Sequence, residues 1–282
     1  MRGLSRSRSL REIFDRNEGR LIHKCDHYFE IYERHFARFR GRAPRILEIG
    51  VFHGGSLEMW RTYFGRGTHV VGVDIEPRCA TLAGRGIDIR IGDQGDAAFL
   101  RRVAEEDGPF DIVIEDGSHL PEHQILAFAE LWPSVNDGGV LLVEDLCTNY
   151  WPEYGGRRGG EGMFMEFVKP LVDEINGFNS RTDDFEPTDF TRTCTGMHVY
   201  DSVVVFDRGD HRPLNTSMTG RPSFGTVDEL EPHHVAAIEA MNRPMRRVRR
   251  AMRSPVRTAE KVANRLRRTA LGVLRRRGSS PS

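Results

Sequence analysis

The chain has 282 residues, of which 38% are hydrophobic and 29% charged, and its 41 basic and 41 acidic side chains give a formal net charge of zero. This composition suits one large globular domain with polar appendages, and no apolar run is long enough for a membrane-spanning helix. The four cysteines form no CxxC pair and the basic N-terminus lacks the apolar core of a signal peptide, so we expect a cytoplasmic protein with reduced thiols and no zinc site.

Strand and helix patterns alternate along most of the chain. Residues 10–40 carry apolar and aromatic side chains at nearly helical spacing and predict N-terminal helix. Apolar runs predict strands at 45–50, 69–74, 87–91, 110–115, 140–143 and 196–206, and helices are expected at 97–106, 123–131 and 164–175. The glycine- and aromatic-rich residues 148–162 predict a loop over the strand ends. This order indicates an α/β fold with a doubly wound, mostly parallel sheet.

A glycine-rich turn, Glu48-Ile-Gly50-Val-Phe-His53-Gly54-Gly55-Ser56, follows the first predicted strand. Its spacing is not the GxGxxG of dinucleotide sites, and no Gly-Lys-Ser/Thr follows as in a phosphate-binding P-loop. Asp74 ends the second strand, where a carboxylate can bind ribose hydroxyls, and Asp93 and Gln94 end the third, where adenine would lie. The ordered set resembles the class I S-adenosylmethionine methyltransferases. That resemblance implies donor binding by Glu48, Gly50, His53, Gly54, Ser56, Asp74, Asp93 and Gln94. The alternatives are an ordinary strand-to-helix turn and, for His53, a surface position.

Carboxylates also end the next two predicted strands, with Asp116 after 110–115 and Glu144 and Asp145 after 140–143. Ligands of open α/β sheets bind at the carboxyl ends of parallel strands, so these side chains meet if the strands are neighbours. Carboxylates so close together would repel one another, which favours a hard divalent cation, Mg²⁺ or Mn²⁺. His119 is then the candidate base for taking a proton from a hydroxyl.

Each of these assignments has a structural alternative. His119 and Asp116 are both placed where a side chain caps the following helix, and one of Glu144 and Asp145 is placed where it can face a loop amide.

Five segments, LEIGVFHGGSLEMW, GVDIEPRC, IEDGSH, VEDL and YWPEYGG, resemble the metal-dependent sugar O-methyltransferases typified by macrocin and mycinamicin O-methyltransferases. The resemblance spans roughly residues 20–206. It implies a magnesium ion held by Asp116, Glu144 and Asp145, His119 as general base, and a sugar hydroxyl of a glycoside or glycan as acceptor. We accordingly divide the chain into an N-terminal helical segment (1–43), a catalytic domain (44–210), a connector (211–240) and a tail (241–282).

Other functions fit the sequence less well. A catechol-type or other small-molecule O-methyltransferase would use the same cation, and a cephalosporin-hydroxylase-like protein would share the architecture. A nucleic-acid methyltransferase is disfavoured because the body is acidic and no Asn/Asp-Pro-Pro-Tyr/Phe segment occurs. A non-catalytic donor-binding scaffold would not need His119 among the carboxylates.

The C-terminal tail, residues 241–282, holds fourteen Arg or Lys residues and a single acid, Glu260. Apolar residues interleave with the basic ones over 241–277, which predicts an amphipathic contact with an anionic membrane surface. The alternatives are a solvated disordered tail and a tail docked on the acidic body. The N-terminal helices are candidate surfaces for a homo-oligomer.

Overall fold

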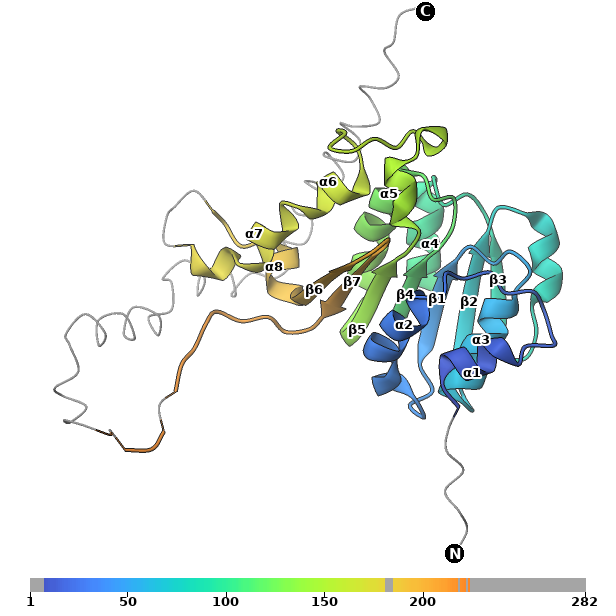
Figure 1. The fold of residues 1–282 in the computed structure, drawn as a ribbon, viewed down its shortest axis with the longest axis horizontal. Coiled ribbons are helices and arrows are strands. Elements are labelled where there is room, and N and C mark those ends of the chain that lie inside the picture. The colour runs from blue at the N-terminus through green and yellow to red at the C-terminus, as the bar shows by residue number, and fades with distance from the viewer. Residues whose placement is uncertain (1–7, 181–184, 218, 222, 224–282) are drawn as a thin grey trace, which may run out of the picture.

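The computed structural model describes residues 8–180, 185–217, 219–221 and 223, which form one seven-stranded sheet between layers of helices (Figure 1). The strands are β1 (Arg45–Ile49), β2 (His69–Asp74), β3 (Ile87–Ile91), β4 (Phe110–Glu115), β5 (Val135–Val143), β6 (Cys194–Tyr200) and β7 (Val203–Arg208). Their order across the sheet is β3-β2-β1-β4-β5-β7-β6. Strands β1 to β5 are parallel, and β7 is antiparallel to both of its neighbours. The predicted doubly wound, mostly parallel sheet is therefore confirmed.

Apolar side chains on the two faces of the sheet build two cores. One face packs against α1 (Leu10–Asp15), α2 (Tyr28–Phe36) and α3 (Gly55–Phe64). The other packs against α4 (Ala97–Asp107), α5 (Pro121–Leu131), α6 (Phe164–Val168), α7 (Leu171–Ile175) and α8 (Asp189–Thr193). Short 3-10 helices lie at Ala37–Phe39, Pro77–Leu82, Trp132–Ser134, Leu146–Tyr150, Pro152–Tyr154 and Gly177–Asn179. Because both faces are covered, polar chemistry is left to the strand ends.

The prediction of helix throughout residues 10–40 is wrong in its middle part. Helix α1 ends at Asp15 and α2 begins at Tyr28, and residues 16–27 between them form no helix. Leu21 is 56% exposed and Cys25 is exposed as well, so two positions that produced the helical spacing do not enter the core. We call these residues the 16–27 segment.

Two further predicted elements are divided in the structure. The expected strand over 196–206 is a hairpin, because Asp201 and Ser202 form a turn in which Ser202 adopts a positive φ of 61°. The expected helix over 164–175 is interrupted before Leu171 by Pro170, whose ring removes a backbone N–H donor.

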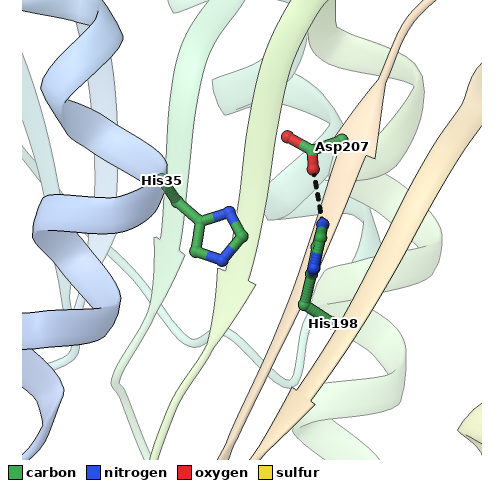
Figure 2. Close-up of side chains that lie close together, drawn as sticks. All are labelled: His35, His198 and Asp207. Atoms are coloured by element: carbon green, nitrogen blue, oxygen red, sulfur yellow. Dashed lines mark hydrogen bonds and ion pairs between the residues drawn. The ribbon is translucent and has the colours of Figure 1, made fainter.

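Helix α2 is tied to this hairpin by a polar cluster (Figure 2). His35 of α2 points toward His198 of β6, and His198 Nε2 lies 2.9 Å from Asp207 Oδ2 of β7. His35 Nε2 lies 2.9 Å from the Tyr200 hydroxyl, and Arg38 Nη2 donates to Asp207 Oδ1 at 2.6 Å. The residue types suit a metal ion, but the Arg38 guanidinium already compensates the only carboxylate of the three. We therefore assign the cluster to the docking of α2.

No helix within the described ranges is both long and apolar enough to cross a bilayer. The predicted tail, 241–282, and most of the predicted connector, 211–240, lie outside the described residues. The domain boundaries given above stay predictions.

Candidate active site

Backbone hydrogen bonds carry the parallel pairing one residue past the ends of the central strands. Gly50 N donates to Val73 O at 2.8 Å, Asp116 N to Ile49 O at 3.0 Å and Glu144 N to Glu115 O at 3.0 Å. The residues that follow β1, β4 and β5 are thus adjacent at one edge of the sheet, as the topology requires.

The glycine turn after β1 depends on the absence of a side chain at Gly50. Its φ is +95°, and a Cβ there would lie 1.9 Å from Asp116 O. Asp74 Oδ2 accepts hydrogen bonds from the N–H groups of Val51 and Phe52 at 2.9 and 3.1 Å. The Asp74 carboxylate therefore fixes the turn against the end of β2.

A cavity of about 750 Å³ opens beside this turn, a volume within the usual range for small-molecule sites. Six of the predicted site residues line it: Gly50, His53, Asp74, Asp116, His119 and Asp145. His23, from the 16–27 segment, lines it too and was not predicted.

The other predicted donor-binding residues do not line the cavity. Glu48 is fully buried, and its Oε2 accepts hydrogen bonds from Ser56 Oγ at 2.9 Å and Trp60 Nε1 at 3.1 Å. Gln94 is also buried, donating to Glu115 Oε1 at 2.8 Å and accepting from Ser118 N at 2.7 Å.

Two more predicted residues occupy turns. Asp93 Oδ1 accepts from Gly95 N at 2.7 Å, and Gly54 precedes α3 in the left-handed conformation, with φ 75°. Direct contact of the donor with Glu48, Gly54, Ser56, Asp93 or Gln94 stays a prediction.

The three predicted metal ligands, Asp116, Glu144 and Asp145, are divided between two groups of side chains that share Asp116. In the outer group, one ligand atom each of Asp116, His119 and Asp145 lies within 4.8 Å of the others. The inner group consists of Glu48, Asp116 and Glu144, within the same limit. The side chain of Glu144 is fully buried, whereas those of Asp116 and Asp145 are 17% and 28% exposed. Only the outer group faces the cavity.

The ammonium group of Lys24 lies inside the inner group. Lys24 Nζ contacts Asp116 Oδ2, lies 2.6 Å from Glu144 Oε1, and lies 3.5 Å from Glu48 Oε1. Burial lowers the pKa of Lys24, but the facing carboxylates, Asp116 first, outweigh burial and raise it well above the ordinary value. Lys24 is therefore a buried cation.

Two tyrosines of α2 hold the carboxylates that follow β5. The Tyr32 hydroxyl donates to Glu144 Oε2, and the Tyr28 hydroxyl donates to Asp145 Oδ1 at 2.7 Å. Burial and then repulsion from Asp116 raise the pKa of Glu144 to about 8. The crowding of carboxylates in the inner group therefore favours the protonated form of Glu144.

His119 occupies a strained turn after β4, with a positive φ of 58°. Its Nε2 lies 3.6 Å from Asp145 Oδ2, while its Nδ1 is buried without a hydrogen-bond partner among the described residues. Burial, ahead of the opposing charge of Asp145, lowers the pKa of His119, so the imidazole is neutral at pH 7.

The oxygen and nitrogen atoms at the cavity wall fit a hard metal ion and a substrate hydroxyl group. Asp116 and Asp145 supply carboxylate oxygens at the cavity wall, as Mg²⁺ prefers, and a neutral His119 stands beside them. Sequence analysis missed Lys24 and Tyr32 because the residues they contact, Asp116 and Glu144, lie 92 and 112 residues away along the chain. One signal was present: Lys24 is one of only three lysines in a chain with 41 basic residues.

Comparison with known proteins identifies the domain that carries these residues. Residues 47–146 match the family model described as a methyltransferase domain. Over 221 residues the chain is 39% identical to the 8-demethyl-8-(2-methoxy-alpha-L-rhamnosyl)-tetracenomycin-C 3'-O-methyltransferase of Streptomyces olivaceus, covering 74% of this chain and 53% of the relative. It is 40% identical to the mycinamicin VI 2''-O-methyltransferase of Micromonospora griseorubida, covering 63% of this chain and 47% of that enzyme.

A solved structure gives the same result. The MycE methyltransferase of mycinamycin biosynthesis, in complex with Mg, SAH and mycinamycin VI, matches with a TM-score of 0.67 at 32% identity, covering 84% of this chain and 60% of that one. The chain spans about half the length of the curated relatives it matches. It carries a methyltransferase domain in a class I methyltransferase fold, similar to the MycE methyltransferase and to the sugar O-methyltransferases named above, as the sequence resemblance predicted.

Proposed function

We propose that the chain is an S-adenosylmethionine-dependent, Mg²⁺-assisted O-methyltransferase that acts on a sugar hydroxyl of a glycoside. The observation that carries the proposal is the meeting of Asp116, Asp145 and His119 at the wall of one cavity beside the Gly50 turn. The similarity to enzymes named for methylation of mycinamicin VI and of rhamnosyl tetracenomycin supports a glycoside acceptor.

The chemistry follows from the residue types. A Mg²⁺ ion at Asp116, Glu144 and Asp145 would lower the pKa of an acceptor hydroxyl and fix its oxygen. His119 takes the hydroxyl proton at Nε2, since Nδ1 is enclosed. The oxygen then bonds to the methyl carbon of the donor, and the breaking C–S bond leaves its electron pair on sulfur. Asp74 and the Gly50 turn hold the donor in line with the acceptor.

Aromatic rings beside His119 offer a surface on which an acceptor ring can pack. The Tyr154 ring lies 6.2 Å from the His119 ring, and the Trp151 ring lies 6.1 Å from Tyr154. Trp151 is 44% exposed and is therefore free to pack on the apolar face of a sugar.

The test is methyl transfer from labelled S-adenosylmethionine to mycinamicin VI, to a rhamnosyl tetracenomycin and to catechol, with EDTA or Mg²⁺ added. We expect transfer to at least one glycoside, its loss with EDTA and its return with Mg²⁺. His119→Ala should lose turnover, whereas His69→Gln, at the start of β2 and paired with Asp88, should keep it. Transfer to catechol alone, or transfer unaffected by EDTA, would contradict the proposal.

We also propose a cytoplasmic location with peripheral contact of residues 241–277 to anionic membrane, and a homo-oligomer formed through the N-terminal helices. The basic composition of the tail supports the first idea. Flotation of the full chain and of a 1–240 chain with phosphatidylserine vesicles tests it, and equal flotation would contradict it.

Sedimentation equilibrium of the full chain tests the proposed homo-oligomer, which a monomer at all concentrations would contradict.

A further inference from the structure

Lys24 is the only basic side chain that the described residues place between the predicted metal ligands Asp116 and Glu144. We propose that Lys24 competes with the divalent ion for these two carboxylates, so that binding of the ion requires the Lys24 side chain to withdraw. The inference rests on the proposed function, because it takes Asp116 and Glu144 as ligands of the ion.

The contacts of Glu144 indicate that the Lys24 ammonium and the divalent ion cannot bind to it at the same time. Its Oε1 is held by Lys24 at 2.6 Å and its Oε2 accepts the Tyr32 hydroxyl, so both oxygens are engaged inside the protein. The side chains of Glu144 and Lys24 are 0% and 3% exposed, which leaves no solvent route between them. Mg²⁺ binds carboxylate oxygens at about 2.0–2.1 Å and would meet the ammonium at contact distance, with like charge.

The side chain that must move belongs to a segment without regular structure, anchored at each end. Near its start, Arg20 Nη1 donates to Leu82 O at 3.0 Å, and after its end the Tyr28 hydroxyl donates to Asp145 Oδ1. Between these anchors His23 lines the same cavity as Gly50 and Asp116. Withdrawal of Lys24 would therefore loosen the 16–27 segment, which supplies part of the cavity wall. Binding of the ion and access of the methyl donor would then be coupled.

The alternative is that the ion uses only the outer carboxylates and that Lys24 remains in place. Asp116 Oδ1 and Asp145 Oδ2 would then be the protein oxygens on the ion, and Lys24 would support Asp116 from behind. In that case the 16–27 segment would keep its place when the ion binds, so the two ideas differ in whether the segment moves.

The experiment measures Mn²⁺ binding by calorimetry to the full chain, to Lys24→Met and to Arg78→Met. Arg78 is the matched control, because its exposed side chain lines the same cavity but contacts Glu76 instead of the metal ligands. We expect Lys24→Met to bind Mn²⁺ at least about tenfold more tightly and Arg78→Met to stay within about twofold of the unaltered chain. Equal or weaker binding by Lys24→Met would overturn the inference. Absence of Mn²⁺ binding by the unaltered chain would instead refute the proposed metal site.

A second measurement needs no variant and detects movement instead of charge. Hydrogen–deuterium exchange of the unaltered chain should become faster in residues 16–27 when Mn²⁺ is added, while β1 and β4 stay protected. Unchanged or slower exchange in the 16–27 segment would show that the ion binds with Lys24 in place, even if Lys24→Met fails to fold.

Discussion

His35 lies where α2 docks on the β6–β7 hairpin. Through this residue the free energy of unfolding should fall as the pH falls below 6.5. The side chain is only 3% exposed, and burial followed by the neighbouring His198 lowers its pKa from 6.5 to about 4. Asp207 opposes this shift, while Arg38 and Arg34 add to it. His35 is therefore neutral in the folded protein at pH values where it is protonated in the unfolded chain.

The sign and size of the effect follow from this difference. Below pH 6.5 the unfolded chain binds a proton that the folded protein does not, so the free energy of unfolding falls as the pH falls. The loss is near zero at pH 7.5, reaches about 2 kcal/mol at pH 5 and levels off at about 3 kcal/mol below pH 4, at about 1.36 kcal/mol for each pKa unit.

The assay is urea denaturation of the chain and of His35→Gln from pH 5 to 7.5. The glutamine can still bond to the Tyr200 hydroxyl but cannot titrate, so His35→Gln should lose less stability on acidification, with a difference of about 2 kcal/mol at pH 5. Only this difference is diagnostic, because Glu115, whose pKa burial raises to about 7, contributes with the opposite sign. Parallel pH profiles of the two proteins would refute the assignment.

Three further changes test the site. Gly50→Ala should abolish binding of S-adenosylhomocysteine in calorimetry, because the new Cβ would meet Asp116 O at 1.9 Å, and retained affinity would show that the turn is not rigid. Tyr32→Phe should lower the free energy of unfolding in urea by about 1.5–3 kcal/mol, because the buried carboxylate of Glu144 loses its hydroxyl donor, and a loss under about 0.5 kcal/mol would contradict that contact. His119→Asn should keep affinity for S-adenosylhomocysteine while kcat falls by about 10²- to 10⁴-fold, and an equal loss of binding would indicate a structural role instead.

The edge of the sheet that carries the site was predictable from sequence because its signals are local. Apolar runs that end in a glycine turn or a carboxylate mark buried strands and their carboxyl ends, and the βαβ rhythm indicates that these strands are parallel. The same reasoning placed Asp116 and Glu144 side by side, which the pairing of β4 with β5 bears out.

The 16–27 segment was not predictable because its conformation is set by distant partners. Helical spacing alone favoured helix through Leu21 and Cys25, but the backbone there packs on Gly55, where a Cβ would lie 2.4 Å from both Arg20 O and Leu21 O. The contacts of Lys24 with Asp116 and Glu144 cross 92 and 120 residues and leave no periodic trace in the sequence.

The carboxylates of the site differ in how deeply their side chains are buried. Glu48 and Glu144 have fully buried side chains and are held by donors from inside the protein, so an internal group already compensates their charge in this structure. Asp116 and Asp145 reach the cavity, and in each of them one oxygen, Oδ1 in Asp116 and Oδ2 in Asp145, accepts no hydrogen bond from the described residues. A cation that enters from the cavity meets the outer pair first and can take Glu144 only by displacing an ammonium already in place. If Lys24 competes with the ion as proposed, the affinity for the ion depends on the N-terminal segment that supplies Lys24 as well as on the strands that supply the ligands.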